Sequence, residues 1–255
     1  DYKVTGVQTC ALPIWGPRPK LSLENQLLLV LSYWRNYGTF LETGTKFGVS
    51  ETVAWKICRW IEDNLKNEKT LHLPGRRSLL SGKEKYEVVA FDVTECPIER
   101  PKKKNWGRRK NQQKYFYSGK KKRHTIKQQI VVDTRTQKII STCQSNGKTH
   151  DFKIYKKSKN YVHPETKIQA DSGYQGIQKI HSNSELPKKR SKKNPLTKED
   201  KENNRRISSD RVIVENIFAF IKKFKILSQR YRNRRKRFGL RFNLICAIFN
   251  YEWNE

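Results

Sequence analysis

The stretch that decides how this chain folds is Val88-Val89-Ala90-Phe91-Asp92-Val93-Thr94. Its β-branched and aromatic residues are typical of a buried strand. One acid, Asp92, lies in the middle of this run. Burying a carboxylate is costly unless it is paired or bound to a metal ion. We therefore take Asp92 as a candidate metal ligand; the alternative is a polar strand residue on an exposed face, without a function.

Two further acids lie in similar places. Asp171 ends the short run 167–171, and Glu215 lies in the helical stretch 209–217. Hard divalent cations prefer oxygen ligands, and two such ions can promote phosphoryl transfer. We therefore predict that Asp92, Asp171 and Glu215 converge on one metal site. For Asp171 alone, the ordinary turn chemistry of Asp-Ser-Gly is an equally good explanation.

The helix around Glu215 carries two cations at helical spacing. Arg211 lies four residues before Glu215 and Lys222 lies seven residues after it. At 3.6 residues per turn all three share one face, so the acid could hold a metal ion while Arg211 and Lys222 bind DNA phosphates. The alternative is an Arg211–Glu215 surface ion pair, worth roughly 0.2–0.5 kcal/mol.

The charge of the chain indicates its partner. Its 255 residues include 55 Lys and Arg against 24 Asp and Glu, a formal net charge of +31. Such a field attracts polyanions, and contacts from Lys and Arg to phosphate supply most non-specific affinity for nucleic acid. An anionic membrane surface is the alternative, but no apolar run approaches the roughly 20 residues of a spanning helix. We predict a nucleic-acid partner and no membrane partner.

The cysteines favour a reducing compartment, and we expect a cytoplasmic, nucleoid-associated protein. They are odd in number and widely spaced, with no CxxC pair or Cys/His cluster typical of zinc. The five are Cys10, Cys58, Cys96, Cys143 and Cys246. We expect them to be small core residues.

Residues 20–67 have the order of a helix-turn-helix domain. A first helix is predicted from apolar residues at three- and four-residue spacing: Leu23, Leu27, Leu28, Val30, Leu31 and Trp34. A short helix over 39–47 follows, then the turn Gly48-Val49-Ser50, with Ser50 as an N-cap. The third helix is expected over 51–65, with one apolar face made of Val53, Ile57, Trp60 and Ile61.

The third helix would enter the major groove of DNA. Its candidates for DNA contact are Ser50, Glu51, Thr52, Lys56 and Arg59. The alternative is a plain three-helix bundle.

The rest of the chain predicts a mixed α/β sheet. Polar residues 68–84 are expected to form a linker to a catalytic domain over 85–255. Strands are predicted over 86–94, 126–133, 137–145 and 167–171, with a short helix over 151–157.

Three basic tracts accompany these elements. The tract 102–123 is expected to follow DNA and includes Lys120, Lys121 and Arg123. The tract 187–206 is expected to be a partly flexible insertion, and the third lies within 216–251. Charge runs are usually solvated faces, so only the three together favour an extended phosphate track.

Taken together, the acids and their surroundings resemble the DDE transposases of bacterial insertion sequences, of the IS-four/IS-five group. The spacing Arg211-x3-Glu215-x6-Lys222 carries the resemblance, with three local motifs: GKTHD at 147–151, ADSGYQG at 170–176 and SSDRVIVE at 208–215. The resemblance covers about residues 20–251. It departs at Ser208, where the family often has Tyr, a residue that is not a metal ligand.

The resemblance implies a fold, a set of catalytic residues and a reaction. It implies an RNase H-like mixed sheet flanked by helices, after a small all-α helix-turn-helix domain. It implies catalysis by Asp92, Asp171 and Glu215 with two Mg²⁺ ions, for which Mn²⁺ could substitute. It also implies cleavage at terminal inverted repeats and transfer into target DNA by a homodimer in the synaptic complex. Asp151 is a further candidate; its alternative role is to favour a helix N-terminus electrostatically.

Two other functions compete with this one. The first is a DNA-binding protein that keeps the scaffold without the chemistry, against which the intact acid triad argues. The second is a nuclease acting on RNA or hybrids, but A-form RNA hides its major groove from a helix. Residues 4–14, VTGVQTCALPI, resemble a translated sequencing adapter, so we expect residues 1–15 to be an artefact.

Overall fold

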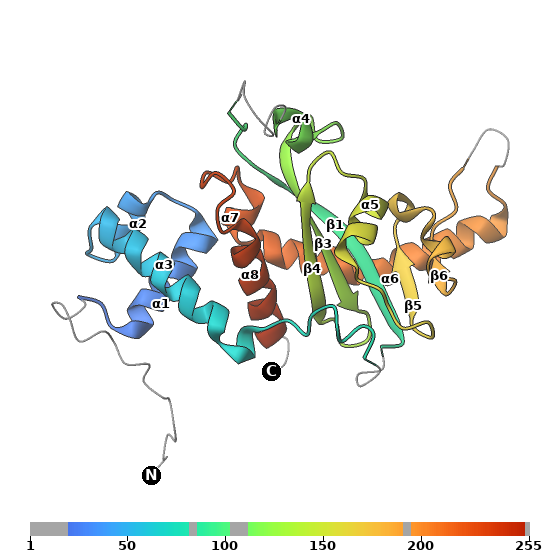
Figure 1. Cartoon of the computed structure of the whole chain (residues 1–255), viewed down its shortest axis with the longest axis horizontal. Helices are drawn as coiled ribbons and strands as arrows, with labels where there is room; N and C mark the ends of the chain where they lie inside the picture. Colours follow the sequence, from blue (N-terminus) through green and yellow to red (C-terminus); the bar gives the residue numbers. More distant parts are fainter. Residues whose placement is uncertain (1–19, 82–85, 103–111, 191–194, 253–255) are drawn as a thin grey trace, which may run out of the picture.

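The computed structural model describes residues 20–81, 86–102, 112–190 and 195–252 (Figure 1). The adapter-like segment 1–15 and Cys10 lie outside the described residues. So do positions 103–111 of the first basic tract and 191–194 of the second. Among the described helices, none is long and apolar enough to cross a membrane.

The N-terminal region forms the predicted helix-turn-helix order. Its helices are α1 (Leu23–Asn36), α2 (Phe40–Lys46) and α3 (Glu51–Asn67). Thr39 and Glu42 form a capping box at the start of α2, and the Ser50 side chain caps α3 by accepting from the Val53 amide at 3.4 Å. Gly48 has φ 67°, the left-handed conformation that the turn needs.

The buried faces of these helices differ from those predicted. On α3 the residues inside are Ala54, Cys58, Ile61 and Glu62, whereas Val53 and Trp60 are exposed. On α1 they are Gln26, Leu29, Val30, Tyr33 and Trp34, whereas Leu23 and Leu28 are exposed. Apolar residues cover more than one face of each helix, so the sequence pattern did not decide which of these faces is buried. The packing of α1, α2 and α8 against α3 decides between them, and Arg241 of α8 pairs with buried Glu62.

Gly44 brings α2 against the start of α3. A Cβ atom there would meet the Val49 carbonyl oxygen at 2.5 Å, a backbone atom that does not move alone. We expect Gly44→Ala to lower the free energy of unfolding by about 1–3 kcal/mol, as overpacking does, measured by chemical denaturation. Gly119→Ala is the control, because nothing lies within 4 Å of its Cβ; equal losses would contradict the argument.

The rest of the chain forms one mixed sheet around β1 (Val88–Pro97). In this sheet β1 pairs antiparallel with β3 and parallel with β5, and β5 pairs parallel with β6. The outer neighbours of β3 are β4 and the short β2. The remaining strands are β2 (Tyr117–Ser118), β3 (Arg123–Asp133), β4 (Ile139–Asn146), β5 (Lys167–Ala170) and β6 (Ser184–Glu185). The predicted mixed α/β fold is confirmed.

Helices cover both faces of this sheet (Figure 1). Successive strand residues point to opposite faces, so Ala90 packs in one apolar cluster and its neighbour Phe91 in another. The Ala90 side is covered by α6 (Lys198–Lys222) and α8 (Phe238–Glu252). The Phe91 side is covered by α5 (Asp151–Ser158). Short elements complete the fold: η1 (Lys69–Leu71), α4 (Gln112–Phe116), η2 (Ser172–Tyr174), η3 (Ile177–Lys179) and α7 (Lys225–Ser228).

Two segments are more ordered than the sequence indicates. The expected linker contains Leu79, which is buried in the cluster on the α5 side, and Gly75, whose amide donates to the Ile140 carbonyl. The prediction that residues 187–206 form a partly flexible insertion is partly wrong. Its last residues form the first turns of α6, which begins at a capping box of Thr197 and Asp200.

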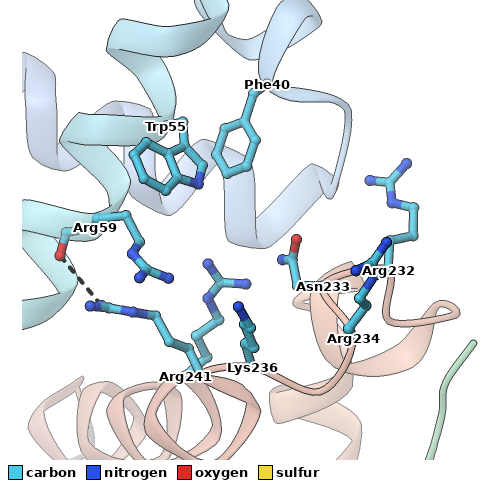
Figure 2. A pocket seen from close by; sticks show the side chains of 9 residues that line it. Phe40, Trp55, Arg59, Arg232, Asn233, Arg234, Lys236 and Arg241 are labelled. Atoms are coloured by element: carbon cyan, nitrogen blue, oxygen red, sulfur yellow. Dashed lines mark hydrogen bonds between the residues drawn. The ribbon is translucent and has the colours of Figure 1, made fainter. Parts of the chain in front are cut away.

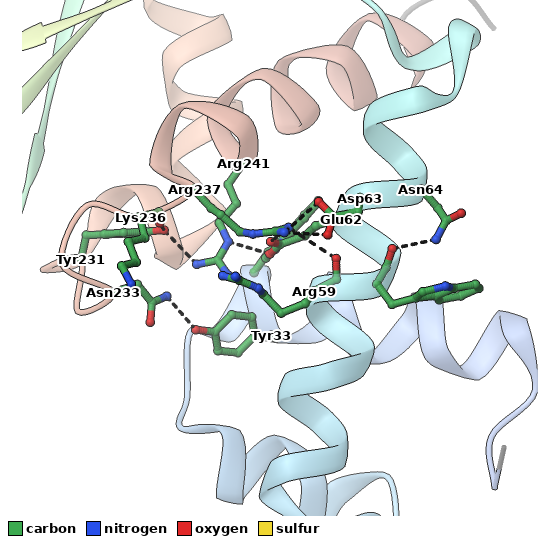
Figure 3. Close-up of polar contacts among 12 residues, drawn as sticks. Tyr33, Arg59, Glu62, Asp63, Asn64, Tyr231, Asn233, Lys236, Arg237 and Arg241 are labelled. Atoms are coloured by element: carbon green, nitrogen blue, oxygen red, sulfur yellow. Dashed lines mark hydrogen bonds and ion pairs between the residues drawn. The ribbon is translucent and has the colours of Figure 1, made fainter. Parts of the chain in front are cut away.

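The helix-turn-helix region and the sheet share one apolar core. The cluster that contains Trp34 and Cys58 also contains Ala90 of β1 and Phe242 of α8. A buried polar network reinforces the junction (Figure 3). Glu62 of α3 is fully buried and accepts from Arg241 Nε at 2.6 Å and Arg237 Nη1 at 3.0 Å. The domain boundaries themselves stay a prediction.

Candidate active site

Asp92 and Asp171 lie at the point where two parallel strands separate. The last register pair between β1 and β5 is Phe91 with Ala170. Asp92 is the next residue of β1 and Asp171 directly follows the end of β5, so both come directly after the last paired position. In open α/β sheets, ligands bind at the carboxyl ends of such strands. The sheet thus brings together two of the three predicted catalytic acids.

Asp92 is held by one cation and one amide. Arg211 Nη2 of α6 donates to its Oδ2 at 3.1 Å, and the Val93 amide donates to Oδ1 at 2.8 Å. The two side chains are only 17% and 14% exposed. Burial raises the pKa of Asp92 to about 6, although Arg211 and the amide act in the opposite direction. The carboxyl group therefore changes charge close to neutral pH.

This raised pKa predicts a pH-dependent metal affinity. Below pH 6 a proton occupies the Asp92 carboxylate, and a metal ion must displace it; above pH 6 the group is already ionised. We expect the Kd for Mg²⁺ or Mn²⁺ to rise about tenfold per pH unit below 6 and to level off above 7. Calorimetric titration between pH 5 and 8 measures this, and a Kd that stays constant would contradict it.

Asp171 and Asp151 meet across Gly173. A Cβ atom placed on Gly173 would lie 2.8 Å from Asp151 Oδ2 and 2.9 Å from Asp171 Oδ1. Asp171 also performs the turn role that competed with catalysis, because its Oδ1 accepts from the Gly173 amide at 2.8 Å. The sequence indicated Asp151 only weakly. The structure places it at the site, at the start of α5, where Lys127 Nζ donates to its Oδ1 at 2.8 Å.

Glu215 lies on the same helix as Arg211 but is exposed. The alternative Arg211–Glu215 ion pair does not form, since Arg211 binds Asp92 instead. Along the described residues, Glu215 has no hydrogen bond or ion pair, so its carboxylate is not engaged elsewhere. Lys222 is exposed at the end of α6, with its Nζ 5.9 Å from the centre of the Phe218 ring.

The donor set is suited to a hard divalent cation. It consists of carboxylate oxygens, the ligands that Mg²⁺ and Mn²⁺ prefer, and an oxygen of Asp151 and one of Asp171 both lie beside Gly173. Across the described parts of the chain, no group of three or more His, Cys, Asp or Glu side chains is close enough to hold a metal ion alone. A third ligand would have to come from Asp92 or Glu215 by a side-chain movement.

Comparison with known proteins identifies the family. Residues 91–250 match the family described as DDE superfamily endonuclease, and residues 19–68 match the helix-turn-helix of DDE superfamily endonuclease. The chain belongs to the DDE superfamily endonucleases. It is 44% identical over 237 residues to the probable transposase for insertion sequence element IS702 of Microchaete diplosiphon, covering 93% of this chain and 83% of the relative.

The candidates for DNA contact in this DDE endonuclease lie in three places. On α3, Ser50 is exposed but its hydroxyl caps the helix, while Glu51, Thr52 and Lys56 are exposed. Arg59 is half-buried and lies over the Trp55 ring at 5.4 Å. The tract before β3 exposes Lys120, Lys121 and Arg123 at the β2–β3 turn. Arg211 and Lys222 lie on α6, beside Asp92 and at the end of the helix respectively.

Sequence reasoning missed Lys127, which pairs with Asp151. The two residues are 24 positions apart, and no spacing rule joins a strand residue to a helix that distant. The available signal was a lysine within the predicted strand 126–133, since a cation that becomes largely buried in a sheet needs a partner.

Proposed function

We propose that this endonuclease is the transposase of an insertion sequence. It cleaves DNA at the ends of its element and joins the freed ends to target DNA. The observation that supports this most is the position of Asp92 and Asp171 at the point where β1 and β5 separate, with Arg211 beside Asp92. The similarity to a probable insertion-sequence transposase over most of both chains supports the same function.

In this proposal Asp92, Asp171 and Glu215 hold two Mg²⁺ ions, for which Mn²⁺ can substitute. When bound, such ions activate the attacking oxygen and stabilise the leaving oxygen of the phosphodiester. Asp151 lies close enough to Asp171 to bind one of the ions directly or to orient Asp171. Glu215 has no competing partner in the described structure, and its ligand role requires that α6 bring it towards Asp92.

The cations of the site have a different task. Arg211 pairs with Asp92, and its buried Nε has no hydrogen-bond partner among the described residues. Guanidinium groups bind phosphate oxygens well, so we assign Arg211 to a DNA phosphate that approaches Asp92. Lys222, with Lys120, Lys121 and Arg123, would contact the DNA backbone further along. Such contacts position DNA without reading its sequence.

The helix-turn-helix region would recognise the terminal inverted repeats, with Thr52 and Lys56 of α3 facing the groove. Ser50, at the start of α3, and Arg59, in the middle of this helix, would also contact the DNA. A synaptic complex joins two DNA ends, for which we propose a homodimer. We place the protein in the cytoplasm, associated with the nucleoid, because its DNA substrates are there.

A strand-transfer assay tests the proposal. The protein is incubated with Mg²⁺, a labelled duplex from the DNA that flanks the gene, and a supercoiled plasmid. A transposase yields labelled fragment joined to plasmid. A simple nuclease yields cleaved duplex without a joined product, and a catalytically silent DNA-binding protein yields neither. Either of these two outcomes would overturn the proposal.

A further inference from the structure

A strongly basic pocket lies between the helix-turn-helix region and the C-terminal segment 231–241. It has a volume of about 320 Å³, within the range of roughly 300–1,000 Å³ typical of ligand pockets. Figure 2 shows side chains from α2 and α3 facing those of the C-terminal segment across the pocket. Six of its nine lining residues are cations: Arg59, Arg232, Arg234, Lys236, Arg237 and Arg241.

Three of these cations already have partners. Arg237 and Arg241 are paired with Glu62, and Arg237 also with Asp63. Arg232 lies 4.3 Å from the centre of the Tyr37 ring and donates to the Gly38 carbonyl at 2.8 Å. These three groups shape the wall of the pocket, and they are not free to bind a ligand strongly.

The other three cations form no ion pair within the described structure, although Arg59, after Arg237, contributes to the lowered pKa of Asp63. Among the described residues, no carboxylate lies within ion-pair distance of Arg59, Arg234 or Lys236. Like charges held around one cavity repel each other, so an anion that enters it relieves an electrostatic cost. The pocket therefore selects a negatively charged occupant.

The backbone of the C-terminal segment is held in an unusual shape. Arg234, Arg235 and Arg237 have φ values of 46°, 67° and 58°, a left-handed conformation that is costly for residues other than glycine. The Tyr231 hydroxyl fixes the segment by donating to the Lys236 carbonyl at 2.6 Å. Strain of this kind persists where a surrounding structure enforces it, and it is common at ligand sites.

The position of the pocket identifies the anion. Thr52, Lys56 and Arg59 follow each other at i, i+4 and i+7, so they form one stripe along α3. Arg59, at the end of this stripe, also lines the pocket. A helix in the major groove, which is about 12 Å wide, has a DNA backbone on each side. The pocket is placed to meet one of these backbones.

We propose that this pocket binds the sugar-phosphate backbone of the duplex whose major groove receives α3. Arg59, Arg234 and Lys236 contact its phosphates. This inference rests on DNA binding by the helix-turn-helix region, as in the proposed function, and adds a clamp contributed by the far C-terminal end of the chain. It explains why α8 and α3 are locked together by Glu62: both sides of the clamp must keep their spacing.

The test measures duplex binding against salt concentration for the full chain. The variant Arg234→Asn/Lys236→Gln removes two of the three cations that make no ion pair, and Asn tolerates the positive φ at position 234. We expect the slope of log K against log salt to fall by about 2, because each phosphate contact contributes roughly 0.9. Affinity at 0.1 M salt should fall about tenfold or more. The loss should be equal for an arbitrary 30-base-pair duplex and one from the element end.

Controls separate this effect from charge and from folding. Lys156→Gln/Lys157→Gln removes two exposed cations at the end of α5, outside the three basic tracts and away from the helix-turn-helix region (Figure 1). This control should change the slope by less than about half a unit. Should the first variant fail to fold, Arg59→Gln replaces it, with an expected fall of about 1. Equal slopes for variant and control would overturn the inference, yet strand transfer by the unchanged protein would still support the proposed function.

Discussion

Replacing Asp92 with Asn is expected to lower metal-dependent DNA cleavage by about 10³-fold or more, a loss of ~4 kcal/mol in transition-state stabilisation. The amide keeps the shape of the carboxylate, and its oxygen still accepts from Arg211, so the fold should persist. It lacks the negative charge that a divalent ion needs. Duplex binding should stay within about twofold, because α3 and its cations are unchanged. Cleavage of end duplexes and a binding titration measure the two effects.

Asp210→Asn is the matched control. Asp210 lies on α6 next to Arg211, but its carboxylate accepts from Gln169 at 3.0 Å and not from Arg211. We expect this variant to cleave within about threefold of the unchanged protein. If Asp92→Asn retains cleavage in Mg²⁺, or if both variants lose it equally, Asp92 is not a catalytic metal ligand.

Replacing Glu62 with Gln is expected to have the largest effect on stability, about 3–5 kcal/mol. Glu62 is fully buried and accepts from Arg241, whose side chain is only 4% exposed. Removing the acid leaves a buried guanidinium without its counter-charge. The loss should appear in chemical denaturation as a lower midpoint with an unchanged slope.

Asp63→Asn provides the comparison for this prediction. Asp63 is adjacent in sequence and pairs with the same Arg237, but its side chain is 57% exposed. Exposed pairs contribute at most about 1 kcal/mol. Exchanging Glu62 and Arg241 together for Met should recover much of the stability, because a packed apolar pair avoids the buried charges. Equal losses for Glu62→Gln and Asp63→Asn would contradict the buried-pair explanation.

Local patterns made much of the fold predictable. The β-branched run of β1, the turn at Gly48 and the cap at Ser50 depend on residues close together in sequence, and the structure has them where expected. The buried face of α3 was predicted only in part: Ile61 is buried and Ile57 packs against the core, but Val53 and Trp60 are exposed. Which face is inside depends on how α1, α2 and α8 pack against this helix.

Some of the acids at the site could likewise be predicted from local sequence, whereas the roles of others depend on the tertiary structure. A strand residue such as Asp92 could be assigned because its apolar neighbours make an unpaired charge costly. Asp151 was weakly indicated, since its closeness to Asp171 depends on the open side of Gly173. For Arg211 the sequence offered a DNA phosphate or an ion pair with Glu215; its pairing with Asp92 was not predicted.

The sequence by itself determined the secondary structure around the site, the basic character of the chain and two of the acids that meet. Those properties follow from short-range periodicity and from the cost of burying charge. Only the tertiary structure decided which residues meet across long separations. Arg211 with Asp92, Asp151 with Asp171, and the C-terminal arginines with α3 are such pairs. Their contacts depend on how the sheet and helices pack as a whole, which no local spacing encodes.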